Sequence, residues 1–146
     1  MSSSPITLRE GVIEDAPFIL NSWLKSYRVS NFARSMTNTV YYEGHHPVVR
    51  KILKRAKVTV ACDPSHPSQI YGYIVHEMVE DIPVIHYCYV KHTFRNMGIA
   101  SNLINSVKES DQAGVFTHHT KNAERIAPKH NLIHHPYLAF NDVKES

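Results

Sequence analysis

The spacing of apolar residues predicts a short strand and then an amphipathic helix at the start of the chain. Residues 6–9 alternate between apolar and polar side chains, which is typical of a strand. Ile19, Trp23 and Tyr27 then recur four positions apart, after an Asp15 that can cap a helix. We therefore expect one face of this helix to pack on a core.

Residues 29–46 show no clear period, and we interpret them as a loop or short helix that forms a lid. Pro47 then predicts the start of a second helix, because proline is accepted in a first helical turn. Basic residues between positions 50 and 57 lie on the outer side of that helix. They are typical of a solvated face, or they favour an acidic acceptor, a phosphate-bearing substrate or nucleic acid.

The middle of the chain alternates with the period of strands over residues 57–62, 70–79 and 84–90. Turn-forming residues separate these runs at 63–68 and 81–83. The first two strands are therefore expected to form a hairpin, and the third to follow it closely.

Helical spacing returns after Gly98, and the short apolar run at 114–117 predicts another strand. Residues 123–127 predict one or two helical turns, and we expect a last extended segment around residues 137–140. The resulting order, β-α-α-β-β-β-α-β-α-β, indicates a single α/β domain over residues 1–146 with an antiparallel front half.

The composition is that of an ordinary globular domain, with 42% hydrophobic and 20% charged residues and a net charge of +3. This mild excess of Lys and Arg does not favour a dedicated nucleic-acid binder. The two cysteines lie in apolar runs without Cys-x-x-Cys spacing, which is typical of a reduced cytoplasmic protein. Residues 1–5 lack the features of a secretory signal, and no apolar stretch approaches the roughly 20 residues that span a bilayer. We expect a soluble, cytoplasmic protein.

The junction over residues 87–101 joins a strand, a short loop and a helix start. Backbone N–H groups at a helix start are free to bind phosphate, and they face the positive end of the helix dipole. Gly98 lacks a Cβ and lets a diphosphate approach, Ala100 keeps the next turn open, and Arg95 supplies a charged donor. The junction is a candidate anion site.

This stretch, Arg95-Asn96-Met97-Gly98-Ile99-Ala100, resembles the pyrophosphate loop of the GNAT family of N-acetyltransferases, Gln/Arg-x-x-Gly-x-Gly/Ala. The order of elements before it is similar too: a strand, two helices, a hairpin and a long fourth strand. The resemblance covers most of the chain and is clearest from about residue 57 to 110. It implies a mixed, mostly antiparallel central sheet flanked by helices, with a splayed fourth strand.

The resemblance also implies that acetyl-coenzyme A is the acyl donor and that no metal is required. Tyr89 and Val90 would contact the pantetheine arm through their backbone. The cofactor-binding set it predicts is completed by Arg95, Asn96, Met97, Gly98, Ile99, Ala100, Ser101 and Asn122. A backbone N–H at the splayed strand end would stabilise the oxyanion that forms when a primary amine attacks the thioester in a ternary complex.

The expected proton carriers differ from those of better-known members of the family. Many carry a Glu early on the fourth strand, and the matching position in this chain is near Val84. His86 lies on the same face of that strand and can accept a proton directly or through water. Many also carry a Tyr in the helix after the fifth strand, near Lys129 here. Tyr137 or His130 is the candidate substitute as acid. Each of these three side chains is otherwise a packed or surface residue.

Several alternatives remain open at this stage. The eleven histidines come largely as adjacent pairs, which chelate a metal poorly, so we expect no metal site. Cys88 on the fourth strand offers a ping-pong route, or it is an inert core thiol. Without the family's Glu and Tyr, the chain is alternatively a non-catalytic module that binds acyl-CoA or a macromolecule.

The acceptor is a small amine, a protein lysine or a protein N-terminus, and the sequence does not choose among them. We expect its cleft to involve residues 29–46, with the aromatic side chains of Phe32, Tyr41 and Tyr42, and the turn near Glu80 and Asp81. The oligomeric state, monomer or homodimer, is left open too.

Overall fold

The computed structural model describes residues 6–30, 33–95, 98–109 and 111–140. Its strands are β1 (Thr7–Glu10), β2 (Lys57–Cys62), β3 (Ile70–Val79), β4 (Ile82–Val90), β5 (Gly114–Phe116) and β6 (Leu132–His134). Its α-helices are α1 (Ala16–Arg28), α2 (Asn38–Arg55), α3 (Ile99–Val107) and α4 (Lys121–Ile126). Short 3-10 helices include η3 (Ala127–His130) and η4 (Pro136–Phe140). The predicted order of strands and helices is confirmed.

All six strands form one sheet in the order β1-β2-β3-β4-β5-β6. Strands β1 to β4 pair with one another antiparallel, whereas β5 runs parallel to β4 and β6 runs parallel to β5. The sheet is therefore mixed and mostly antiparallel, as the resemblance implies.

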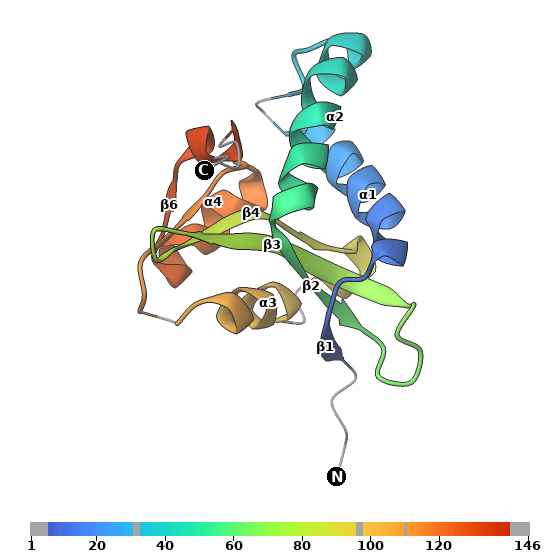
Figure 1. The fold of residues 1–146 in the computed structure, drawn as a ribbon, viewed down its shortest axis with the longest axis vertical. Helices are drawn as coiled ribbons and strands as arrows, with labels where there is room; N and C mark the ends of the chain where they lie inside the picture. Colours follow the sequence, from blue (N-terminus) through green and yellow to red (C-terminus); the bar gives the residue numbers. More distant parts are fainter. Residues whose placement is uncertain (1–5, 31–32, 96–97, 110, 141–146) are drawn as a thin grey trace.

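Helices cover both faces of this sheet (Figure 1). The apolar sides of α1 and α2 pack on one face, where Trp23, Val49 and Ile52 are fully buried with Tyr73 of β3. Helices α3 and α4 pack on the other face, where Leu103 is fully buried. The alternation of side chains along the strands supplies both cores, because successive residues point to opposite faces.

Helix α2 begins earlier than Pro47, so the expected helix start is wrong. Thr37 caps the helix, and its hydroxyl accepts a hydrogen bond from the Val40 amide at 3.2 Å. Pro47 lies inside the helix on an exposed face, although its missing N–H and its ring disfavour helix interiors. Packing of Tyr41, Val49 and Ile52 on the core outweighs that cost.

The proposed lid is correspondingly shorter than residues 29–46, because the second half of that segment is helix α2. Phe32 lies outside the described residues. Tyr41 is buried, and its hydroxyl donates a hydrogen bond to the Leu24 carbonyl at 2.6 Å, so it belongs to the core. Tyr42 is partly exposed and packs edge-on against Tyr41.

The last strand is β6 at Leu132–His134, and the extended segment expected around residues 137–140 is instead helix η4. Asn131 precedes β6 in a left-handed conformation, with a φ of 55°. The backbone thereby turns into register with β5, where Gly114 pairs with Leu132. Pro136 then ends the strand, because proline has no N–H to donate to a ladder.

The hairpin between β3 and β4 turns at Glu80 and Asp81, both in the left-handed region with φ values of 50° and 67°. This two-residue turn pairs Val79 with Ile82, at the opposite end of β4 from Val90. Within the described residues, no helix combines the length and apolar character that a membrane crossing requires.

Candidate functional site

Strands β4 and β5 pair over a short length and then separate. The described pairing joins Val84 to Val115 and Ile85 to Phe116, and the Thr117 amide adds a hydrogen bond to the Ile85 carbonyl at 3.1 Å. Beyond Ile85, β4 continues to Val90 without a paired strand on that side among the described residues. The fourth strand is therefore splayed from the fifth, as the resemblance implies.

A β-bulge lies in β4 at the point of separation. On β3, Val75 pairs with Tyr87 and His76 pairs with Ile85, so His86 is an extra residue on β4. Such an insertion disrupts the ladder locally and turns backbone groups away from their usual partners. The inserted residue is left out of the ladder pairing, and it lies at the same level of β4 where the strands part.

A cavity of about 410 Å³ occupies the space where the strands separate. Its walls come from β4, the start of α3 and helix α4 with the residues around it. Its volume lies in the range of small-molecule and cofactor sites, about 300–1,000 Å³. Its described lining has three Lys or Arg side chains and no Asp or Glu: Arg95, Arg125 and Lys129. The cavity therefore suits an anionic ligand.

The start of α3 forms one wall of this cavity. Gly98 precedes the helix in a left-handed conformation with a φ of 77°, and a Cβ built there meets no atom of the described residues beyond its chain neighbours within 4 Å. The first helical backbone bond of α3 between described residues runs from the Asn102 amide to the Gly98 carbonyl. Amides in a helix's first turn lack acceptors in their own helix, so this wall offers donors to an anion.

Arg95 reaches this wall from the loop before α3. Its Nε donates a hydrogen bond to the Val90 carbonyl at 3.2 Å, which ties the guanidinium to the end of β4. Most residues of the predicted cofactor-binding set line the cavity: Val90, Arg95, Gly98, Ile99, Ala100, Ser101 and Asn122. Tyr89 lines a second cavity, described next, and Asn96 and Met97 lie outside the described residues.

The second cavity, of about 810 Å³, lies between α1 and β4. It includes Lys25 of α1 and Val29, Ser30 and Arg34 of the connection that follows. Residues that line both cavities are Tyr87, Cys88, Val90, Arg95, Thr120 and Asn122. The two cavities therefore meet along the outer half of β4. The turn at Glu80 and Asp81, which the sequence analysis expects near the acceptor, is absent from the described lining of both cavities.

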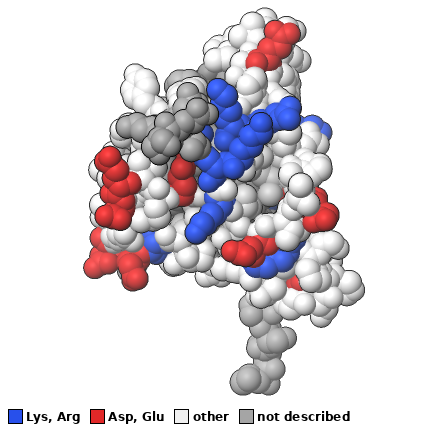
Figure 2. Space-filling model, viewed as in Figure 1, with Lys and Arg blue, Asp and Glu red and all other residues white. Residues whose placement is uncertain are grey.

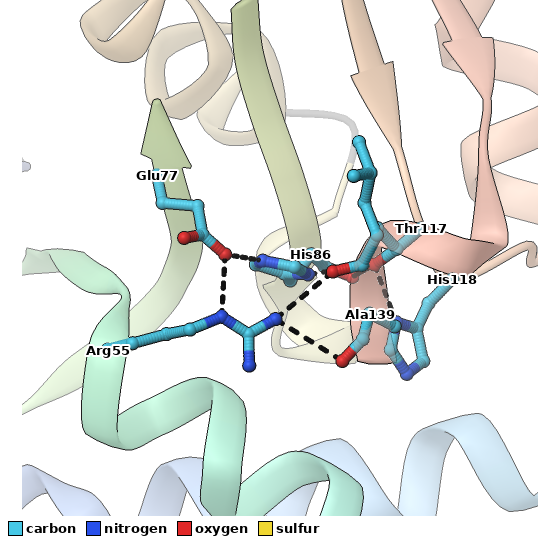
Figure 3. Close-up of polar contacts among 7 residues, drawn as sticks. Arg55, Glu77, His86, Thr117, His118 and Ala139 are labelled. Carbon is cyan, nitrogen blue, oxygen red and sulfur yellow. Dashed lines mark hydrogen bonds and ion pairs between the residues drawn. The ribbon is translucent and has the colours of Figure 1, made fainter. Parts of the chain in front are cut away.

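A network of buried and partly buried polar side chains runs beside the first cavity (Figure 3). The Arg55 Nε donates to Glu77 Oε2 at 3.1 Å, and the same oxygen lies 2.5 Å from His86 Nε2. His86 Nδ1 lies 3.0 Å from Thr117 Oγ1, which lies 2.9 Å from His118 Nδ1. His86 was predicted from the sequence as a proton carrier, whereas its partners Glu77 and Thr117 were not.

The direction of each hydrogen bond follows from the Glu77 carboxylate, which can only accept. His86 Nε2 must donate to it, so Nδ1 of the neutral ring accepts the Thr117 hydroxyl proton. Thr117 Oγ1 then accepts from His118 Nδ1, which leaves His118 Nε2 to accept from His45 Nε2 at 2.9 Å. Every side-chain polar atom of this network from His118 Nε2 to Glu77 Oε2 therefore has a hydrogen-bond partner.

His86 is 1% exposed, and burial lowers its pKa, while the hydrogen bond that His86 donates to the Glu77 carboxylate opposes this shift. Its neutral ring can therefore accept a proton, with a carboxylate ready to stabilise the charge. Arg55 also holds the C-terminal segment, because its Nη2 donates to the Leu138 and Ala139 carbonyls at 3.1 and 3.3 Å.

The two candidate acids lie in different surroundings. Tyr137 is 78% exposed on η4 and is not among the described residues that line either cavity. His130 is buried on η3, and its Nε2 lies 3.3 Å from the hydroxyl of Ser101, which lines the first cavity. The structure thus brings His130 nearer to the predicted loop than Tyr137.

Cys88 lines both cavities, but burial raises the pKa of its thiol to about 12. A thiol with so high a pKa stays protonated near neutral pH, and only the thiolate is a strong nucleophile. This favours direct transfer over a ping-pong route. Within the described part of the chain, no three His, Cys, Asp or Glu side chains are placed to share a metal ion.

The basic residues of α2 lie away from both cavities. Figure 2 shows Lys and Arg side chains gathered over α2 on the face turned to the viewer, and the helix contributes Arg50, Lys51, Lys54 and Arg55. None of them is among the described lining residues of either cavity. Arg55 is committed to Glu77, so the solvated-face interpretation fits this run better.

Acid should destabilise the fold through the buried histidines. Burial lowers the pKa of His45 to about 4 and holds that of His118 well below its usual range. Because both pKa values are lower in the folded chain than in the unfolded chain, the neutral histidines contribute their full share of the free energy of unfolding above about pH 6.5. It is lost as the pH falls toward 4, at up to about 1.4 kcal/mol per pH unit for each histidine.

Urea unfolding between pH 7.5 and 4.5 measures this loss. We expect the variant His45→Gln, whose amide can still donate to His118, to show a shallower decline than the unmodified protein. The exposed His66 on the 63–68 turn provides the matched control, and His66→Gln should leave the slope unchanged. A free energy of unfolding that stays level from pH 6.5 to 4.5 would contradict the account.

Comparison with known proteins identifies the fold. No protein-family profile and no characterised protein sequence matches the chain. Among solved structures, a possible acetyltransferase from Clostridium difficile 630 superposes with a TM-score of 0.58, 17% identity and coverage of 98% of both chains. A structure described as a putative acetyl transferase from Pyrococcus furiosus superposes with a TM-score of 0.56 and 16% identity. The match covers 97% of this chain and 95% of that one.

A third structure carries the acyl donor. The GNAT family acetyltransferase from Brucella melitensis, solved in complex with acetyl-CoA, has a TM-score of 0.53 and 15% identity, and the match covers 83% of this chain and 80% of that one. The chain spans 62% of the length of a Staphylococcus aureus Mu50 GNAT acetyltransferase and 63% of YjaB from Escherichia coli. A mixed sheet flanked by helices, splayed where β4 leaves β5, thus gives this chain the fold of the GNAT acetyltransferases.

Proposed function

We propose that this protein transfers an acetyl group from acetyl-CoA to a primary amine by direct attack in a ternary complex. One observation supports this most strongly: the cavity at the β4–β5 separation joins the α3 amides to the unpaired half of β4. A diphosphate fits at the amides and at Arg95, and a pantetheine arm fits along β4 as an extra extended partner. The lining carries cations and no described carboxylate, which matches the charge of coenzyme A.

The acceptor reaches the thioester from the second cavity, because the two cavities share Tyr87 and Cys88 on β4. Attack of the neutral amine on the thioester carbonyl places negative charge on its oxygen. A backbone donor at the His86 bulge stabilises that oxyanion. Its collapse breaks the C–S bond and expels CoA as a thiolate, which takes a proton from solvent. Holding both reactants against one strand supplies the proximity that the reaction needs.

His86 is the proposed proton acceptor, at its Nδ1. In the neutral ring this atom accepts the Thr117 hydroxyl proton at 3.0 Å, and the same hydroxyl has a second acceptor, the His86 carbonyl, at 3.4 Å. When Nδ1 gains a proton from the amine, through water, the Thr117 hydroxyl can turn to the carbonyl and accept from Nδ1. Both protonation states are therefore satisfied, and Glu77 stabilises the imidazolium.

Release of free CoA thiol from acetyl-CoA tests the proposal against a panel of small amines, amino acids and peptides with a free N-terminus. We expect release that depends on both the amine and the protein, with an acetylated product found by mass spectrometry. Binding of acetyl-CoA without release from any amine would instead support a non-catalytic module of the same fold. The absence of both binding and release would refute the proposed function.

A further inference from the structure

The Lys and Arg side chains of the second cavity have no acidic counterpart in its described lining, and two of them lie outside the proposed acetyl-CoA site. The described lining of the second cavity contains four Lys or Arg side chains and no Asp or Glu: Lys25, Arg34, Arg95 and Lys121. Lys25 and Arg34 do not line the first cavity, and both are exposed. Neither forms an ion pair with a carboxylate of the described residues. The α1 side of the site therefore presents two cations that no described carboxylate neutralises.

We propose that the acceptor is a small amine that carries its own anionic group, a carboxylate or a phosphate, bound by Lys25 and Arg34. This inference rests on the proposed acetyl transfer and names the substrate class for it. A cavity of about 810 Å³ has the size of small-molecule sites, about 300–1,000 Å³, so it suits a metabolite-sized molecule. Cations in a cleft attract an anion and strengthen each other's field on it.

The position of the two cations orients the acceptor. Lys25 lies on α1, and Arg34 on the connection that follows it, whereas the thioester site lies across the cavity at Tyr87 and Cys88 of β4. An acceptor whose anion pairs with the cations on the α1 side presents its amine to β4. The described lining also includes uncharged polar side chains of α1, among them Asn21 and Ser22, so it adds no negative charge beside the cations.

The cations of the lining as a whole, which include Arg95 and Lys121, favour the reactive form of the amine. An ammonium group close to Lys and Arg side chains is disfavoured relative to the neutral amine, because like charges repel. The described lining holds no carboxylate that could stabilise the ammonium. An amine that carries an anion therefore binds more tightly through its anionic end, and its ammonium end loses a proton more readily. His86 receives the second proton, which leaves the nitrogen during attack.

Matched pairs of amines test this inference: O-phosphoethanolamine against ethanolamine, and γ-aminobutyrate against butylamine. At saturating acetyl-CoA, we expect kcat/KM about 10- to 100-fold higher for an anionic member, as charge-assisted hydrogen bonds provide. The pair that shows the preference distinguishes phosphate from carboxylate. Equal or higher kcat/KM for both neutral amines, or faster acetylation of a peptide N-terminus, would overturn the inference.

The double variant Lys25→Gln/Arg34→Gln should raise KM for the anionic amine and remove the preference. Its dissociation constant for acetyl-CoA should stay unchanged, because neither residue lines the first cavity. The matched control is Arg50→Gln/Lys54→Gln, which removes two exposed charges of α2 outside both cavities and should retain the preference. A preference that survives in Lys25→Gln/Arg34→Gln would contradict the assignment.

Direct binding separates this inference from the proposed function. Calorimetric titration with O-phosphoethanolamine and γ-aminobutyrate requires no turnover. Binding of one of them that is lost in Lys25→Gln/Arg34→Gln but kept in the control would support the anion site even if no amine released CoA. Turnover of neutral amines with no binding of either anionic probe would support acetyl transfer and refute the anionic acceptor.

Discussion

Replacement of Gly98 by Val should abolish acetyl-CoA binding and leave the fold intact. Gly98 has a φ of 77°, which costs a residue with a Cβ roughly 1–2 kcal/mol, and a β-branched side chain adds restriction at χ1. That cost is smaller than the 5–15 kcal/mol of stability that is typical of a domain, so the variant should fold. A Cβ at this position meets no atom of the described residues beyond its chain neighbours within 4 Å, and Gly98 lines the first cavity, so we expect the added atoms to enter the space proposed for the diphosphate.

Isothermal titration calorimetry with acetyl-CoA measures the effect, and we expect at least a 100-fold rise in the dissociation constant. Gly44 supplies the matched control, because a Cβ there also meets nothing within 4 Å and the residue lies on α2, outside both cavities. Gly44→Val should bind as the unmodified protein does. If Gly98→Val bound within twofold of the unmodified protein, the α3 amides would not hold the cofactor.

Replacement of Glu77 by Gln should reduce the rate of acetyl transfer about 10²-fold or more, the lower range for loss of a positioned general base. Burial lowers the pKa of His86, and the Glu77 carboxylate is the group that opposes this shift. Without its charge the pKa of His86 falls further, and the ring becomes a weaker base. The acidic limb of the pH profile of kcat/KM should therefore move to lower pH while the plateau falls.

The pH profile separates this positioning role from a merely structural one. Gln keeps the size of Glu, but Arg55 loses its ionic partner, so urea unfolding must show that the variant is folded at the assay temperature. Glu43→Gln on the exposed surface of α2 is the matched control and should leave rate and profile unchanged. An acidic limb that stays in place in Glu77→Gln would remove His86 from the proton path.

The local pattern was sufficient to predict the order of elements. Apolar spacing located helix α1 and strands β2 to β4 because their buried faces dictate the period. It failed at α2, where Pro47 lies inside the helix and the packing of Tyr41 and Val49 outweighs the local signal. It failed again at residues 136–140, where the carbonyls of Leu138 and Ala139 accept from Arg55, a contact between distant parts of the chain.

The lining of the first cavity was predictable where one short segment supplies it. The loop before α3 combines Arg95 and Gly98 in consecutive sequence, so its lining role could be predicted. The partners of His86 could not, because the bulge in β4 shifts the register with β3 and brings Glu77 to the ring. Thr117 joins through the parallel pairing of β5, which no local pattern specifies. The Glu within the apolar run at 70–79 was the one available signal, since a charge in a buried strand requires a partner.

The most direct measurement is a crystal structure of the protein with acetyl-CoA. It should show the diphosphate against the backbone amides at the start of α3 and beside Arg95, with the pantetheine extended along β4 between Ile85 and Val90. The thioester should lie at the junction of the two cavities, near Tyr87 and Cys88. Acetyl-CoA bound elsewhere, or a β4–β5 opening that stays empty at millimolar acetyl-CoA, would contradict the account.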